Sequence, residues 1–107
     1  MGVLQIRDLN DVFRSTFIGG KVMMTEGVSN LAPEALAALM SDVRTFHAFT
    51  QDNDPQGEHD FGSIDIAHEK YFWKIDYYDK SLEFGSPDPS DPAVTTRVLT
   101  IMRADEY

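Results

Sequence analysis

The stretch from Tyr71 to Tyr78 constrains the fold more than any other part of the sequence. It reads Tyr-Phe-Trp-Lys-Ile-Asp-Tyr-Tyr, and aromatic and β-branched residues of this kind favour strands. Alternate side chains of a strand point to opposite faces of its sheet. We therefore expect Trp73 and Ile75 to face the core with Tyr71 or Tyr77, while the other face carries Phe72, Lys74, Asp76 and Tyr78.

The clearest helix is predicted to run from Pro33 to about His47. Proline is well tolerated at the first helical position, and the acidic Glu34 suits the positive end of the helix dipole. Apolar residues then recur at helical spacing, at Leu36, Leu39, Met40, Val43 and Phe46. A domain of this length must pack its main helix on its sheet. We therefore expect Trp73 to be buried against this helix.

Weaker patterns complete the predicted architecture. An amphipathic helix is expected over residues 7–16, and strands over 21–25, 62–66 and 82–84, with turns at Glu69-Lys70 and Asp79-Lys80. Residues 93–103 are ambiguous: their β-branched residues favour a strand, but Pro92 and a helical spacing of apolar residues favour a helix, which we prefer. The prediction is a single α+β domain over residues 1–107, with a small antiparallel sheet of about four strands and two or three helices.

The composition is strongly acidic. Eighteen Asp and Glu against nine Lys and Arg give a net charge of −9, and the span from Thr45 to Glu69 contains no Lys or Arg. Binding to nucleic-acid phosphates requires a basic surface, so direct nucleic-acid binding is not expected. The charge is compatible with a solvated surface, with cation binding, or with docking onto a basic protein partner.

Several classes of protein are disfavoured by what the sequence lacks. There is no cysteine, which suits a cytoplasmic location and removes thiolate chemistry. No apolar run approaches the roughly 20 residues of a membrane helix, and the start does not resemble a signal peptide. No phosphate loop, dinucleotide fingerprint or nucleophile elbow occurs, so no cofactor is expected. Self-association stays open.

The segment from Asp52 to Asp60 is the densest group of polar residues. Its start matches half of a calcium-binding EF-hand loop, but Ser63 stands where the bidentate Glu should be, so an EF-hand is rejected. Three carboxylates form a weaker candidate cation site, at Asp52, Asp54 and Glu58. His59 and Asp60 are the candidate catalytic residues, with His59 as a general base. The alternative is purely structural, because Asp and Asn side chains commonly cap their own turns.

The second face of the 71–78 strand is a candidate interaction surface. Phe72 and Tyr78 flank the charged Lys74 and Asp76 on this face. Aromatic side chains are common anchors at protein interfaces. Two alternatives stay open: helices cover both faces of the sheet, or Lys74 and Asp76 pair with neighbouring strands.

Several long segments resemble one family of small bacterial proteins. These are Phe49-Thr50, 52–55, 57–62, 72–79 and 97–102. The family is known only as a domain of unknown function, and its members are often encoded on plasmids and other mobile elements. The resemblance implies a bacterial, cytoplasmic domain and supplies no activity, cofactor or catalytic residue. It favours an interaction role, such as modulating a host defence or plasmid-maintenance system.

Two classes of function follow. The first is a non-enzymatic interaction or regulatory protein that binds a basic partner, with an acidic mimic of nucleic acid as one version. The second is an enzyme or cation-binding protein with its site on the Asp52–Asp60 loop. A mimic requires clustered acidic side chains, whereas a loop site requires its polar side chains to converge beside a pocket.

Overall fold

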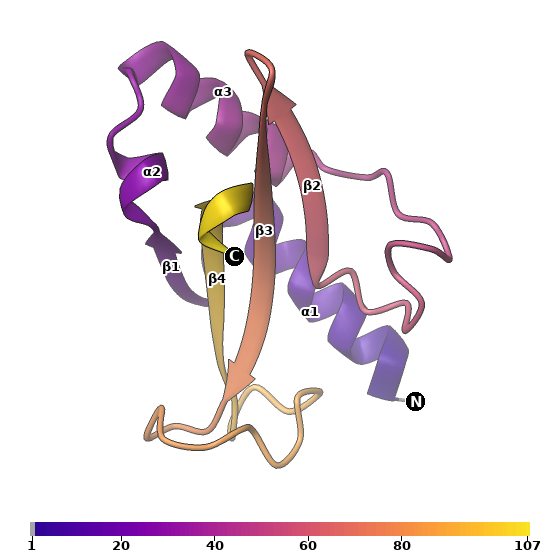
Figure 1. Cartoon of the computed structure of the whole chain (residues 1–107). Coiled ribbons are helices and arrows are strands. Elements are labelled where there is room, and N and C mark those ends of the chain that lie inside the picture. The colour runs from indigo at the N-terminus through magenta and orange to yellow at the C-terminus, as the bar shows by residue number, and fades with distance from the viewer. Residues whose placement is uncertain (1) are drawn as a thin grey trace.

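The computed structural model describes residues 2–107. Three helices and four strands follow one another along the chain, with a short 3₁₀ helix at the end (Figure 1). In chain order they are α1 (Gly2–Thr16), β1 (Gly20–Met24), α2 (Glu26–Ser29), α3 (Pro33–Arg44), β2 (Phe61–Ile66), β3 (Glu69–Tyr78), β4 (Thr96–Arg103) and η1 (Ala104–Glu106). No helix within residues 2–107 is long and apolar enough to cross a membrane.

The four strands form one sheet in the order β1-β4-β3-β2. β2, β3 and β4 pair antiparallel, as expected for a meander, whereas β1 runs parallel to β4. This confirms the predicted small α+β fold with about four strands and three helices, and adds one parallel pair at the sheet edge. A parallel pair needs a long crossover. Here α2, α3, β2 and β3 all lie between the two paired strands in the sequence.

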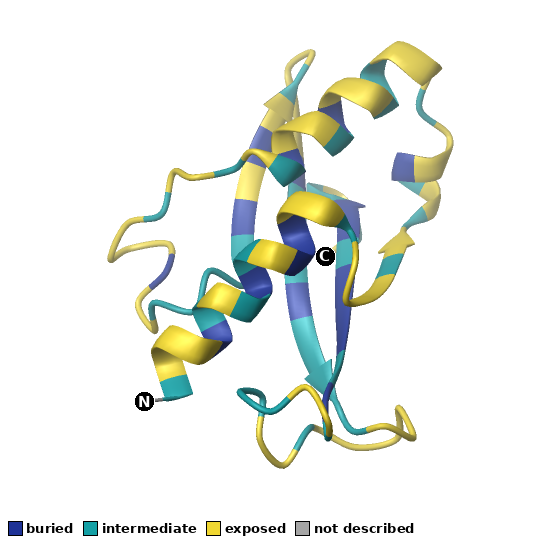
Figure 2. Cartoon of the chain, turned by 180° about the vertical axis from the view of Figure 1, so that it is seen from behind, coloured by how far each residue is buried: buried dark blue, intermediate teal, exposed yellow. Residues whose placement is uncertain are grey.

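The helices α1 and α3 lie across the same face of the sheet (Figures 1 and 2). Trp73 is fully buried beneath them, as predicted, and packs in one cluster with Ile75 and the α3 residues Leu39 and Val43. From β4, Leu99 and Ile101 complete the centre of this cluster. We call this side of the sheet the covered face.

Residues 93–103 do not form the helix that we preferred. Thr96–Arg103 is a strand, β4, and it lies inside the sheet between β1 and β3. The segment is rich in β-branched residues, and its backbone N–H and C=O groups pair with β1 on one side and with β3 on the other. This pairing outweighs the helical signal of Pro92. The segment before it, including Pro92, is an irregular loop that ends in the strand.

Two smaller details of the predicted meander also differ. The turn between β2 and β3 is at Ala67 and His68, both with positive φ, two positions earlier than predicted. The expected return strand at residues 82–84 does not form, because Leu82 also adopts a positive φ of 62° that interrupts an extended backbone. Only an isolated bridge between Tyr78 and Gly85 remains of it.

Candidate functional site

The Asp52–Asp60 loop is organised by hydrogen bonds within the loop itself. The Asn53 side chain accepts from the Thr50 amide and donates to the Ala48 carbonyl, at 2.8 and 2.9 Å. The carboxylate of Asp54, which is 9% exposed, accepts from the backbone N–H of His59. Side chains that cap the backbone of their own turns in this way are what the structural interpretation of the loop predicts.

His59 fastens the loop to α1 and does not face a cavity. Its Nδ1 lies 2.9 Å from Asp11 Oδ1, and its Nε2 lies 3.7 Å from Asp54 Oδ2. The imidazole also stacks on Phe49, with 3.8 Å between ring centroids. A general base needs one nitrogen within reach of a substrate. Both nitrogens of His59 face carboxylates, and none of the four cavities described within residues 2–107 is lined by this residue.

Asp60 and the three candidate cation ligands do not combine into a site. Burial, with help from Glu58, raises the pKa of the Asp60 carboxyl. Within residues 2–107, no three His, Asp or Glu side chains are grouped so that they could hold a metal ion. Asp52 is exposed to solvent, Asp54 faces His59, and Glu58 accepts a hydrogen bond from the Tyr77 hydroxyl at 2.7 Å.

A buried polar network that the sequence patterns did not predict lies under α1. Asn10 is 0% exposed; its amide donates to the Glu58 carbonyl at 3.0 Å and to the Tyr77 hydroxyl at 2.8 Å. Its carbonyl oxygen accepts from Arg97 Nε at 2.7 Å. Burial and the bond to Glu58 raise the pKa of Tyr77, so its hydroxyl stays protonated. The available signal was Asn10 itself, a polar residue four positions after Ile6 on the apolar stripe of α1.

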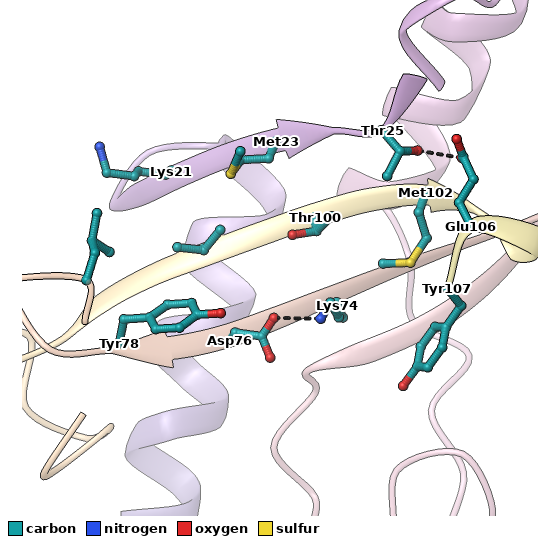
Figure 3. Close-up of a pocket in the computed structure, with 12 residues that line it drawn as sticks. Lys21, Met23, Thr25, Lys74, Asp76, Tyr78, Thr100, Met102, Glu106 and Tyr107 are labelled. Atoms are coloured by element: carbon teal, nitrogen blue, oxygen red, sulfur yellow. Dashed lines mark hydrogen bonds and ion pairs between the residues drawn. The ribbon is translucent and has the colours of Figure 1, made fainter. Parts of the chain in front are cut away.

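Within residues 2–107, the opposite side of the sheet carries no helix except η1 (Figure 1), and we call it the uncovered face. A groove of about 520 Å³ crosses it (Figure 3). Its lining is largely apolar and comes from β1, β3, β4 and the C-terminal residues: Met23, Tyr78, Leu82, Val98, Met102 and Tyr107, with Lys21, Thr25, Lys74, Asp76, Thr100 and Glu106. Figure 3 shows Lys74 and Asp76 pairing with each other, at 3.0 Å, rather than with neighbouring strands.

Both predicted interaction residues lie on this uncovered face. Tyr78 lines the groove directly. Phe72 lies farther along the same strand, where its ring packs against Phe61 at 5.2 Å and Tyr107 at 5.6 Å between centroids. Of the two predicted alternatives, coverage of both faces by helices does not occur within residues 2–107.

The acidic side chains do not gather on one side of the molecule. Exposed carboxylates occur on every helix, on two strands and on both long loops, at Asp8, Glu26, Glu34, Asp42, Asp52, Asp65, Glu69, Glu83, Asp88 and Asp105. The span from Thr45 to Glu69 contains no Lys or Arg, but three of its carboxylates are at least half-buried in the loop, at Asp54, Glu58 and Asp60. This dispersed distribution does not favour a mimic of a nucleic-acid backbone.

Comparison with known proteins identifies a family and no activity. The family model described as a protein of unknown function, DUF3768, matches residues 24–106. That match includes every strand except the first four residues of β1, and it also includes the Asp52–Asp60 loop. No curated protein and no solved structure matches the chain. The chain therefore belongs to the DUF3768 family of proteins of unknown function.

Proposed function

We propose that this protein is a non-enzymatic interaction protein that binds a basic partner protein through the uncovered face of its sheet. The observation that carries the proposal is the apolar groove across β1, β4 and β3, which no segment of residues 2–107 fills. Exposed apolar surface of this kind, with a polar rim, is characteristic of contact sites. Met23 and Tyr107 are 56% and 76% exposed there.

An amphipathic helix is the partner element that fits this face best. On the covered face the same sheet already accepts helices, α1 and α3, whose apolar stripes pack against it. Four strands spaced by about 4.8 Å give a platform wide enough for one more helix of about 10 Å diameter. A helix on the uncovered face would add a third layer over Tyr78, Val98 and Met102.

Charge favours a basic partner over an acidic one. The chain carries a net charge of −9, which attracts cations at long range and repels acidic proteins. Within the groove the lining charges balance, with Lys21 and Lys74 against Asp76 and Glu106, so the attraction for a basic partner comes from the net charge of the rest of the chain, which includes the exposed Glu83 next to Leu82. A helix with an apolar stripe flanked by Lys or Arg complements this surface.

Site-specific photo-crosslinking tests the proposal in cells. A photoreactive phenylalanine analogue is placed at Tyr78 in the groove and, as the matched control, at Ala37 on the exposed side of α3. We expect a covalent adduct with a basic protein from position 78 and none from position 37. Adding Met23→Glu on the same face should remove the adduct without unfolding the protein, because Met23 is exposed.

Three results would contradict the proposal. Equal adducts from both positions would show non-specific contact with an acidic protein. An adduct between two copies of the chain would indicate self-association, and an acidic partner would refute the charge argument. A defined probe gives a second readout: a Leu/Lys amphipathic helical peptide should shift the amide resonances of Tyr78, Thr100 and Met102, while its Leu/Glu counterpart should not.

The proposal includes a cellular setting for the protein. We infer a cytoplasmic location, supported by the absence of cysteine. A bacterial origin and a role on mobile elements, such as modulating a host defence system, rest on the resemblance described above. Fractionation of the source cells, followed by detection of the protein in the cytosolic fraction, tests the location.

A further inference from the structure

A second, smaller cavity lies on the other side of the sheet, beneath α1. Its volume is about 230 Å³, and it is bounded by α1, by the connection from α1 to β1, and by the segment that precedes β4. Most of the wall is apolar, from Leu9, Val12, Phe13, Ile18 and Pro92. Arg97 and Lys80 also line it. It shares no lining residue with the groove of the uncovered face.

Arg97 is a buried cation without a carboxylate partner. The residue is 3% exposed and takes part in none of the ion pairs formed within residues 2–107. Its hydrogen bonds go to neutral acceptors, the side-chain oxygen of Asn10 from Nε and the Pro89 carbonyl from Nη2. Its third nitrogen, Nη1, has no hydrogen-bond partner in the described chain and, unlike Arg14 Nε, is not fully enclosed, so it keeps some accessible surface where Arg97 lines the cavity. A buried guanidinium in this state is costly unless an anion compensates it.

Among residues 2–107, hydrogen bonds link Arg97 to one carboxylate, and that link is indirect. Asn10 and Tyr77 connect the guanidinium to Glu58, and both are uncharged links. The Tyr77 ring also stacks near the guanidinium, with 5.2 Å from Cζ to the ring centroid. Consistent with incomplete compensation, burial lowers the pKa of Arg97. The network orients the guanidinium and leaves its charge without a direct counter-ion.

We propose that this cavity binds a small organic carboxylate with a short aliphatic chain. The carboxylate would contact Arg97 and Lys80, and the chain would lie against Leu9, Val12 and Ile18. A single negative charge balances Arg97, the buried cation of this cavity, whereas a phosphate would add excess charge to a protein that is already at −9. The volume lies below the roughly 300–1,000 Å³ typical of sites for drug-sized ligands, so the ligand must be small.

Hexanoate is a suitable probe because its carboxylate and its aliphatic chain can each be removed in a matched ligand. The titration follows the amide resonances of Gly19, Thr95 and Arg97 in the ¹⁵N-labelled full chain, with 1-hexanol, acetate and inorganic phosphate as matched ligands. We expect saturable shifts with hexanoate. Hexanol lacks the charge-assisted hydrogen bonds and acetate lacks the buried methylene groups, so each should bind roughly tenfold more weakly or worse.

Variants assign the effect to the cavity. Lys80→Gln should weaken hexanoate binding by about three- to tenfold, because Lys80 is an exposed contact at the rim. Lys21→Gln, which removes an equivalent exposed lysine from the uncovered face, is the control and should leave the affinity unchanged.

Each other outcome would overturn the proposal. Equal binding of hexanol would reduce the cavity to an apolar pocket, and equal binding of acetate or phosphate would show an adventitious ion only. Shifts confined to Tyr78 and Thr100 would place hexanoate in the other groove. The absence of saturable shifts with any ligand, with the chain folded, would make Arg97 a purely structural group of the network around Asn10.

Discussion

The two faces of β3 both carry aromatic side chains but have opposite surroundings. Toward α1 and α3, Trp73 is 0% exposed, and both neighbouring strands contribute apolar residues to its cluster, Ile64 from β2 and Leu99 and Ile101 from β4. On the face toward solvent, Phe72 and Tyr78 are half-buried. The Lys74–Asp76 ion pair separates them along the strand, and Tyr78 lines the groove. Aromatic residues alone therefore do not make a face part of the core. The covered face combines its aromatic residues with Ile75, whereas the uncovered face carries the charged Lys74 and Asp76.

The largest expected effect is on the covered face. Trp73→Ala should lower the free energy of unfolding by about 3–5 kcal/mol, because it removes the largest fully buried side chain and leaves a cavity. Phe72→Ala, one position away on the uncovered face, should cost about 1 kcal/mol. Urea unfolding of both variants measures the contrast. Equal losses would show that the uncovered face contributes as much to stability as the core.

The buried network beneath α1 should rank second. Asn10→Leu keeps the branched shape of the side chain but leaves Arg97 Nε and the Glu58 carbonyl without that partner, which should cost about 2–4 kcal/mol. Ser15→Leu, a polar-to-apolar change on the exposed side of the same helix, should stay within about 0.5 kcal/mol. Chemical denaturation compares the two. If Asn10→Leu were neutral, the network would not hold α1 on the sheet.

Close packing against Trp73 gives a third comparison, at β2. A Cβ on Gly62 would lie 2.6 and 2.8 Å from Cε2 and Cζ2 of the Trp73 indole and would also contact Nε1. Because Trp73 is fully enclosed, Gly62→Ala should cost about 1–3 kcal/mol. Ser63→Ala, at the next residue on the uncovered face, should change stability by less than about 0.5 kcal/mol. A Gly62→Ala variant that melts like the parent protein would mean that the indole can move.

The smallest effect is expected at the C-terminal end of the uncovered face and depends on pH. Hydrogen bonds from the Thr25 hydroxyl and from the amides of Arg103 and Gly27 lower the pKa of Glu106 below its usual 4.5. A carboxyl with a lowered folded-state pKa stabilises the protein above its unfolded-state pKa, and this stabilisation is lost as the pH falls through the folded-state value.

Glu106→Gln should therefore lower the melting temperature at pH 7, and the difference from the parent protein should shrink as the pH falls below 4.5. Thermal melts at several pH values measure it, with Glu83→Gln on the exposed loop as the control. A difference that stays constant with pH would mean that size or geometry, and not charge, is what Glu106 contributes.

Local patterns predicted the parts of the fold that depend on local physics. The alternation around Trp73 identified both faces of β3, and Pro33 with the following apolar spacing located α3, although the helix ends at Arg44 and not near His47. The loop residues were correctly identified as a dense polar segment. Their partners were not, because Asn10 and Asp11 lie almost fifty positions earlier in the sequence and only the docking of α1 brings them to the loop.

The error at β4 has the same physical origin. Within residues 93–103, Pro92 and helical spacing are short-range signals, whereas the strand is stabilised by pairing with β1 and β3, both distant in sequence. The parallel register of Lys21 with Val98 has no short-range signal. Alternation predicted that Phe72 and Tyr78 share the second face of β3, but it did not predict the groove on that face, and the cavity at Arg97 requires three segments that meet only in the folded chain.

The central position of β4 has a consequence for how the protein is made. As the chain leaves the ribosome, α1, β1, α3 and the β2–β3 hairpin all emerge before β4 exists, so β1 has no strand to join. The apolar face of the hairpin meanwhile stays open to other chains, and non-local pairing of this kind folds slowly. Folding of roughly the first ninety residues is thus postponed until β4 has been synthesised. A chain that terminates before Thr96 should therefore fold much worse than the small number of missing residues alone would suggest.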